Sequence, residues 1–146
     1  MMKLSTKGRY ATRIMVYLSM QNSQVPCRKQ EIADAESISA DYVEQILIRL
    51  KAAGLVLSHR GARGGFSLAR PPSEVTVAEV LAATEGPLSL VACSDEGCER
   101  ETICVTQRIW RAAEEALSKV FSGTVISELA ESAAELAKSK SITYDI

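Results

Sequence analysis

The chain has 146 residues, of which 47% are hydrophobic and 24% charged, and its formal net charge is −1. This length suits one domain, or a small domain with an appended element, with enough apolar residues for a buried core. The composition excludes a membrane span, because no run approaches the roughly 18 consecutive apolar residues that a span requires. The N-terminus has no uninterrupted apolar stretch typical of a signal peptide, so we expect a cytoplasmic protein with no membrane association.

Charge is divided unevenly along the chain. Residues 1–70 contain eleven Lys or Arg against five Asp or Glu, a net charge of +6, whereas residues 71–146 have a net charge of −7. The sign changes at Pro71-Pro72, which also predicts a domain boundary. A basic first half indicates a polyanionic partner and leaves another role for the second half.

Three helical patterns precede the prolines. After Ser5, apolar residues recur at Tyr10, Ile14 and Leu18, the spacing of one helix face. Residues 29–36 predict a second, short helix. A third helix is predicted over residues 39–53, with Ser39 as its N-cap and Val43, Ile46, Leu47 and Leu50 facing inward. Its outward residues are Asp41, Glu44, Gln45, Ile48 and Arg49.

Residues 55–69 predict a β-hairpin. Strands at 55–58 and 66–69 flank a glycine-rich tip over residues 60–65, which contains Arg60 and Arg63. We therefore predict a mainly α fold with a small hairpin wing, a winged helix-turn-helix. Helix 39–53 would enter the major groove of double-stranded DNA, and the wing would reach the minor groove or the phosphates. The alternative is a winged helix used only for protein contacts.

Three more helices are predicted after the prolines, over residues 76–84, 105–121 and 124–137, with a frayed tail from Lys138. Thr76 and Glu79 form a capping-box pattern. The apolar stripe on helix 105–121 is broader than one intramolecular face needs, which indicates a homodimer. The alternative is that this helix packs on its own winged-helix domain. We thus predict a DNA-binding domain over 1–70, and a cysteine loop with dimerisation helices over 71–146.

Three of the four cysteines, Cys93, Cys98 and Cys104, lie in one loop with four acidic residues. A disulfide fits poorly in a reducing cytoplasm. The acids should raise the pKa of the thiols and so suppress their reactivity, whereas a bound cation would offset the negative charge. The Cys-x4-Cys-x5-Cys spacing lacks the tight Cys-x2-Cys pairs of structural zinc sites. It favours an iron–sulfur cluster over a single metal ion or a thiol switch.

The remaining cysteine and the sole histidine are assigned other roles. Cys27 lies beside Arg28 and Lys29, two charges that could activate it, but we favour a small buried apolar residue. His59 falls in the first wing strand, where we expect a surface or DNA-side residue and not a metal ligand.

Four segments resemble a known family: LSTKGRYATRIM, SADYVEQILIRLKAAGLV, RGARGGFSLAR and CVTQRIW. They are similar to the IscR-like cluster-sensing members of a bacterial winged-helix repressor family that also includes NsrR and CymR. The resemblance covers residues 2–130. It implies a homodimeric DNA-binding transcription regulator, not an enzyme, with an iron–sulfur cluster on Cys93, Cys98 and Cys104. A [2Fe–2S] cluster is favoured over [4Fe–4S].

The resemblance also suggests roles at the DNA. Glu44 resembles the recognition-helix acid that tunes site preference with cluster occupancy, and Arg60 resembles the arginine of the wing. Together with the basic residues of the first half, the expected DNA-binding set is Arg9, Arg28, Ser39, Tyr42, Glu44, Gln45, Arg49, Arg60 and Arg63.

One departure from the family concerns the fourth cluster ligand. The family has a histidine three residues after the last cysteine, and here that residue is Gln107. The fourth ligand is therefore open between Gln107, a carboxylate such as Glu101, a group of a partner subunit, water or a small thiol. Two further functions stay open: a cluster-free regulator that senses thiol oxidation or a protein partner, and an iron–sulfur electron carrier.

Overall fold

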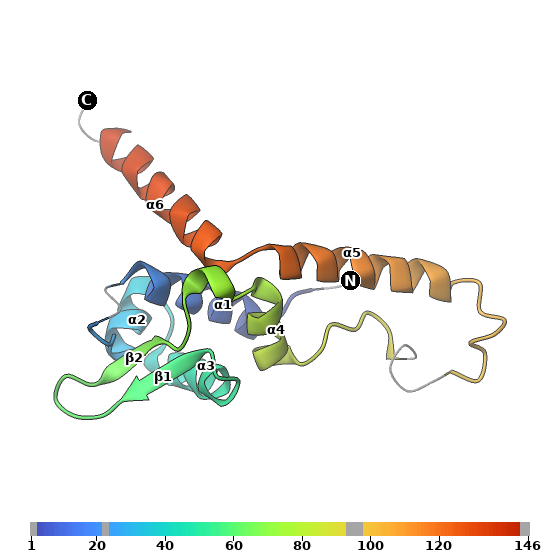
Figure 1. Ribbon diagram of the computed structural model, residues 1–146, viewed down its shortest axis with the longest axis horizontal. Helices are drawn as coiled ribbons and strands as arrows, with labels where there is room; N and C mark the ends of the chain where they lie inside the picture. Colours follow the sequence, from blue (N-terminus) through green and yellow to red (C-terminus); the bar gives the residue numbers. More distant parts are fainter. Residues whose placement is uncertain (1–2, 22–23, 93–97, 144–146) are drawn as a thin grey trace.

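A computed structural model describes residues 3–21, 24–92 and 98–143 (Figure 1). The described chain forms six α-helices, one 3-10 helix and one antiparallel β-hairpin, which confirms the mainly α class with a small wing. In chain order these are α1 (Thr6–Met20), α2 (Lys29–Glu36), α3 (Ala40–Ala52), β1 (Val56–His59), β2 (Gly65–Leu68), η1 (Pro72–Glu74), α4 (Val77–Glu85), α5 (Gln107–Gly123) and α6 (Ile126–Thr143). No helix in these ranges has the length and apolar character needed to cross a membrane.

Helices α2 and α3 form the helix-turn-helix, and local signals position both. The Ser39 hydroxyl caps α3 by accepting a hydrogen bond from the backbone N–H of Tyr42 at 3.3 Å. Helix α2 ends at Ser37, whose φ of +54° turns the chain sharply toward α3. The inward face of α3 is the predicted one, since Val43, Ile46, Leu47 and Leu50 are all buried.

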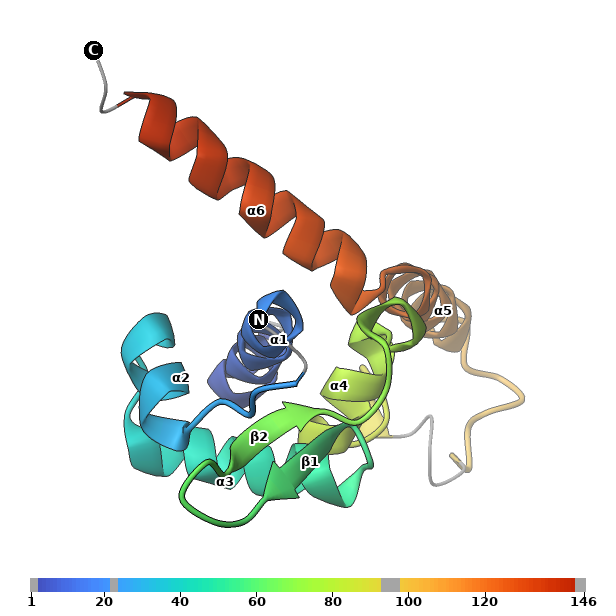
Figure 2. The same ribbon diagram turned by 60° about the vertical axis from the view of Figure 1, so that its left-hand side comes forward.

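The hairpin follows α3 and lies beside it as the wing (Figure 2). Val56 pairs with Leu68 and His59 with Gly65, so each strand is shifted by one residue from its predicted range. A backbone bridge joins the wing to the segment before α2: Cys27 and Phe66 exchange two N–H···O hydrogen bonds of 2.8 Å. The wing is therefore held to α2 as well as to α3.

The core extends past the two prolines. Helix α4 begins at the predicted capping box, in which the Glu79 N–H donates to Thr76 Oγ1 and the Thr76 N–H donates to Glu79 Oε2. Val75, Val80 and Ile126 belong to the same buried cluster as the cores of α1 and α3. Helix α4, the start of α6 and the helix-turn-helix thus share one core.

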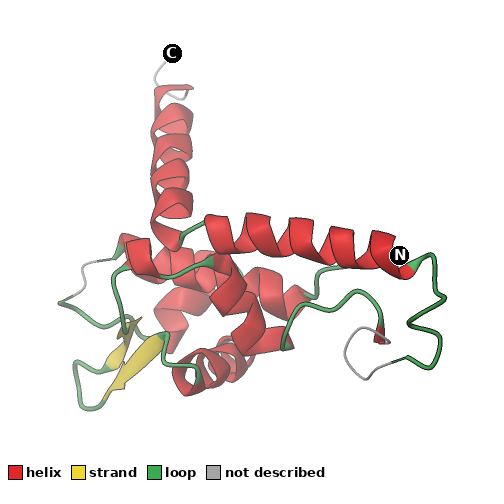
Figure 3. Ribbon diagram, turned by 45° about the vertical axis from the view of Figure 1, so that its right-hand side comes forward, coloured by secondary structure: helices red, strands yellow, loops and turns green. Residues whose placement is uncertain are grey.

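Helices α5 and α6 leave this body in different directions (Figure 3). None of the residues of α5 is buried, and only the first turns of α6 contact the core, through Ile126 and Leu129. The predicted frayed tail from Lys138 is wrong, because α6 continues to Thr143. Residues 126–143 contain no Gly or Pro and consist mainly of good helix formers, so nothing in the sequence ends the helix there.

Candidate nucleic-acid interface and cysteine loop

The outer face of α3 is exposed as predicted. Glu44, Gln45 and Arg49 all lie on it and are exposed, together with Ile48. Tyr42 is only half-buried and packs edge-on against Tyr10 of α1, with ring centroids 5.9 Å apart. The structure thus places polar side chains and one apolar side chain on a surface that no other described element covers.

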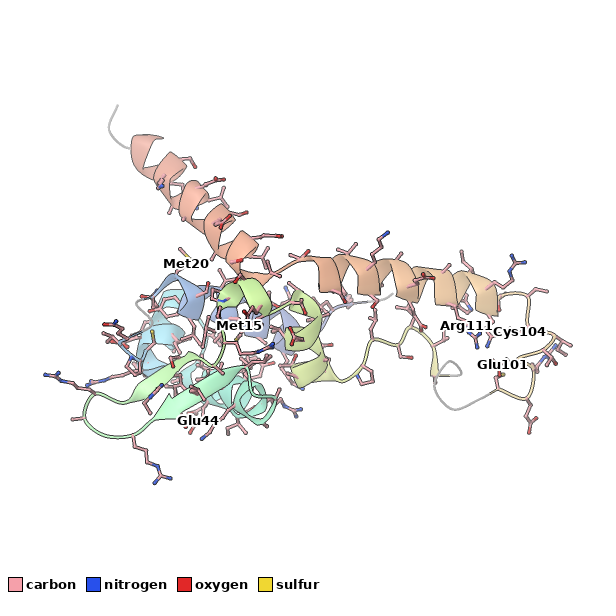
Figure 4. The ribbon with its side chains drawn as sticks, viewed as in Figure 1. Met15, Met20, Glu44, Glu101, Cys104 and Arg111 are labelled. Carbon is pink, nitrogen blue, oxygen red and sulfur yellow. The ribbon has the colours of Figure 1, made fainter. Side chains whose placement is uncertain are left out.

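Glu44 forms an ion pair that sequence reasoning missed. Its Oε2 lies 2.6 Å from Nζ of Lys29, the first residue of α2. Figure 4 shows Glu44 on the side of α3 that faces away from the helical body. The hydrogen bond to Glu44 raises the pKa of Lys29, and the charges of Glu44 and Asp41 add to this effect. Because the partners are 15 residues apart, no local sequence pattern pointed to the pair.

The wing tip has two exposed arginines, Arg60 and Arg63. Arg28 is placed differently from the other predicted DNA-contacting residues: its Nη2 donates to the backbone carbonyl of Ala62 at 2.8 Å. The guanidinium of Arg28 therefore ties the start of α2 to the wing tip. His59 lies on the exposed face of β1, where its Nε2 is 2.8 Å from Ser67 Oγ.

Arg9 lies on another part of the molecule. Its guanidinium donates to Thr6 Oγ1 at 3.3 Å on α1, and its side chain lines a groove of about 680 Å³ between α1, α5 and α6. The groove is mainly apolar, with Val120, Phe121 and Leu129 among its walls. Helix α5 reaches this groove through Val120 and Phe121 near its C-terminal end.

The cysteine loop lies at the far end of α5 from the helical body (Figures 1 and 4). Cys93 lies outside the described residues, while Cys98 and Cys104 are both half-buried. Tight backbone hydrogen bonds fold the segment between them, from the Glu101 N–H to the Cys98 carbonyl and from the Ile103 N–H to the Arg100 carbonyl. Residues 98–143 and the other described ranges contain no group of three His, Cys, Asp or Glu side chains that could hold a metal ion.

Cys104 is placed where a thiolate is stabilised. Its Sγ lies 3.3 Å from Thr106 Oγ1, and the start of α5 directs backbone N–H groups at it. The Thr106 hydroxyl first, and then the N–H groups of Gln107 and Thr106, lower the pKa of the Cys104 thiol. The prediction that the loop acids raise the thiol pKa is therefore wrong for Cys104, because these hydrogen bonds, and then the charge of Arg100, lower its pKa against the effect of burial.

The two residues suggested as a fourth ligand lie next to each other. Gln107 Nε2 is 3.5 Å from Oε1 of Glu101, and the same carboxylate oxygen is 2.5 Å from the guanidinium of Arg111 (Figure 4). Sequence reasoning missed Arg111, although it lies one helical turn after Gln107 on α5. A carboxylate and an amide thus converge beside Cys104.

Cys27 is the buried apolar residue that was predicted. It is 8% exposed, and burial, followed by the charge of Glu31, raises the pKa of its thiol. The neighbouring Arg28 and Lys29 direct their charges to the wing tip and to Glu44 instead. Cys27 therefore differs from Cys104 in both exposure and the direction of its pKa change.

Comparison with known proteins identifies the family. The model of the Rrf2 family, described as an iron-dependent transcriptional regulator, matches residues 4–132. The HTH-type transcriptional regulator IscR of Aliivibrio salmonicida is 35% identical over 129 residues, which cover 88% of this chain and 77% of that protein. Protein rrf2 of Nitratidesulfovibrio vulgaris is 33% identical over 130 residues, which cover 88% of this chain and 87% of that protein.

Two solved structures have the same fold. CymR, the global cysteine regulator of B. subtilis, superposes with a TM-score of 0.76 at 34% identity, covering 90% of this chain and 98% of CymR. IscR of T. potens superposes with a TM-score of 0.76 at 30% identity, covering 92% and 90%. These likenesses confirm the resemblance to IscR-like proteins and the winged-helix architecture. The chain therefore belongs to the Rrf2 family of transcription regulators.

Proposed function

We propose that this regulator is a homodimer whose DNA binding is controlled by an iron–sulfur cluster held by Cys93, Cys98 and Cys104. The observation that carries the proposal is the environment of Cys104, where the start of α5 favours the thiolate form. Thiolates are the protein ligands of iron–sulfur clusters, so this thiol suits the role. The family description, an iron-dependent regulator, agrees with the proposal.

The donor set near Cys104 suits a cluster with one weak ligand. Gln107 and Glu101 are within reach of each other, and the Glu101 carboxylate is neutralised by Arg111. A cluster bound here would be held by the thiolates of Cys93, Cys98 and Cys104 and would supply redox chemistry. We favour [2Fe–2S] over [4Fe–4S], with the fourth position taken by Gln107, Glu101 or an external group.

DNA would be bound by α3 in the major groove and by the wing over residues 60–65 in the minor groove or on the phosphates. The exposed outer face of α3 and the exposed arginines of the wing support this placement. The contacts that we propose come from Arg28, Ser39, Tyr42, Glu44, Gln45, Arg49, Arg60 and Arg63. Arg9 is left out of this set, because its side chain lines the groove between α1, α5 and α6. Arg28 would act mainly by holding the wing, through its hydrogen bond to Ala62.

The cysteine loop must act on DNA binding through a second protomer. Within one chain, the loop and the wing lie at opposite ends of the molecule (Figure 1). Helix α5 begins three residues after Cys104, and its apolar side chains Ile109, Trp110 and Val120 are exposed. If these apolar side chains pack between two protomers, a change at the loop would shift α5 and so alter the distance between the two α3 helices of the dimer. Cluster binding at the loop would then change how the pair of α3 helices meets DNA.

The test uses protein purified without oxygen. We expect iron, inorganic sulfide and visible absorption in the wild type, and their loss in Cys98→Ser and Cys104→Ser. Cys27→Ala is the matched control, because Cys27 is buried far from the loop and should leave the iron content unchanged. A wild-type protein that stays colourless and iron-free after reconstitution would rule out the cluster.

The second candidate function is a cluster-free regulator that senses thiol oxidation. The lowered pKa of Cys104 favours it, because a thiolate is the form that oxidants attack. It predicts iron-free protein whose duplex affinity changes with peroxide and recovers with dithiothreitol. Replacement of Cys104 by Ser would abolish that response, whereas replacement of Cys27 by Ala would leave it intact.

A further inference from the structure

The ion pair between Lys29 and Glu44 does not serve stability. Both side chains are exposed, at 37% and 52% of their surface, and an exposed ion pair adds little to the free energy of unfolding. The pair also spans two separate helices, the start of α2 and the outer face of α3. A role at the DNA explains its position better than a role in the fold.

An acidic side chain on a DNA-facing helix needs a counter-charge. Phosphates repel a free carboxylate, so Glu44 alone would weaken binding to every duplex. Lys29 offsets this charge from one side by binding Oε2 at 2.6 Å. In the described part of the chain, Oε1 of Glu44 accepts no hydrogen bond. A carboxylate held in this way presents a free acceptor oxygen to the groove, and cytosine N4 is the donor in the major groove that Glu recognises.

We propose that Lys29 is a positioning residue for sequence recognition, which holds the Glu44 carboxylate so that it accepts a hydrogen bond from a cytosine amine. This inference rests on the proposed DNA-binding role of α3 and adds a residue of α2 to it. Lys29 reaches Glu44 from the first position of its helix, where the chain is fixed by the Cys27–Phe66 bridge on one side. The position of the carboxylate is thereby tied to the wing anchor as well as to α3.

The consequence is a coupling between two residues. Without Lys29, the carboxylate rotates freely and its charge is uncompensated, so the preference for cytosine falls together with the affinity. Without Glu44, Lys29 has no partner to position, and its removal leaves the base preference unchanged. A lysine that contacts only phosphate behaves differently, because it changes affinity for all sequences alike and flattens the salt dependence by about 0.9 in the log–log slope.

The experiment measures base preference with the full-length protein. Duplexes are first selected from a random pool by the wild type, and a panel then varies each base pair of the selected site. The variants are Lys29→Met, Lys29→Arg, Glu44→Ala and the double variant Lys29→Met with Glu44→Ala. Lys51→Met is the matched control, since Lys51 is an exposed lysine at the other end of α3. Circular dichroism and chain mass confirm that each variant is folded.

We expect Lys29→Met to reduce the preference for cytosine at one position of the site by about five- to tenfold, within the range for one side chain on one base. Lys29→Arg should keep most of it, and Lys51→Met should leave the preference unchanged. In the Glu44→Ala background, Lys29→Met should change no base preference by more than about twofold.

Two results would overturn the inference. One is a preference that survives Lys29→Met in full. The other is a loss of affinity on Lys29→Met that is equal for all duplexes and the same with Glu or Ala at position 44. That result would make Lys29 a phosphate contact. If the wild type selects no sequence from the pool, the DNA-binding role of α3 fails and the inference fails with it. If the wild type binds selectively and Lys29→Met has the same base preference, the role of Lys29 is refuted but the DNA-binding role of α3 is not.

Discussion

Gly65 is the point at which the wing comes closest to the segment before α2, and its replacement tests how the wing is held. Its φ is +155°, and a Cβ at this position would lie 2.5 Å from the carbonyl oxygen of Cys27 and 2.7 Å from the carbonyl carbon. These are backbone atoms, which cannot rotate away as a side chain can. Gly65→Ala therefore forces the wing from its anchor and strains the two Cys27–Phe66 hydrogen bonds.

The expected loss follows from these contacts. Overpacking costs about 1–3 kcal/mol, and the two backbone hydrogen bonds contribute about 1 kcal/mol each, so Gly65→Ala should lower the free energy of unfolding by about 3–5 kcal/mol. Gly61→Ala is the control, because Gly61 also has a positive φ, of +101°, but an added Cβ meets no atom within 4 Å. Only backbone strain of about 1–2 kcal/mol is expected there.

Urea denaturation of both variants at one protein concentration measures the difference. Binding to a selected duplex measures the effect on the wing, and we expect a larger loss of affinity for Gly65→Ala than for Gly61→Ala. Equal stability of the two variants would refute the reasoning, because it would mean that the wing can move away from Cys27 without cost.

Three further predictions concern the loss of stability at acid pH, the reactivity of the Cys104 thiol and the retention of iron. The hydrogen bond from the Thr76 N–H lowers the pKa of Glu79, so the Glu79 carboxylate stabilises the fold above its unfolded pKa, and this stability is lost as pH falls through the folded pKa. Glu79→Gln should therefore reduce the loss of unfolding free energy at acid pH, measured by urea titration at several pH values. We expect a difference of less than about 1 kcal/mol, because the side chain is exposed. If the variant loses as much unfolding free energy at acid pH as the wild type, other groups cause that loss. In iron-free protein, Thr106→Val should shift alkylation of Cys104 by iodoacetamide to higher pH, and an unmoved profile would contradict the cause given for its lowered pKa. Gln107→His should slow iron loss to a chelator, since imidazole is a better iron ligand than an amide, whereas equal rates would place the fourth ligand elsewhere.

Local signals were sufficient for the helix-turn-helix. The spacing of Val43, Ile46, Leu47 and Leu50 and the cap at Ser39 predicted the buried face and the start of α3, because both depend on residues within one or two turns. The hairpin was also predictable from its glycine-rich tip, although each strand lies one residue nearer the tip than predicted.

Contacts between distant residues could not be predicted in the same way. The Arg28–Ala62 hydrogen bond joins residues 34 apart and the Lys29–Glu44 pair joins residues 15 apart, so both depend on how α2 packs beside α3 and the wing. The lowered pKa of Cys104 was missed for another reason. Charge counting along the loop overlooked the hydroxyl of Thr106 and then the N–H groups of Gln107 and Thr106, which lower this pKa.

The most direct test of cluster control is DNA affinity measured as a function of iron content in the same preparation. Protein purified without oxygen is titrated against its selected duplex before iron removal, after chelation, and after reconstitution with iron and sulfide, with Cys104→Ser treated in parallel. We expect the wild-type affinity or site choice to change on iron removal and to return on reconstitution, while the variant stays constant throughout. Wild-type binding that is identical at all three iron contents would contradict control by a cluster.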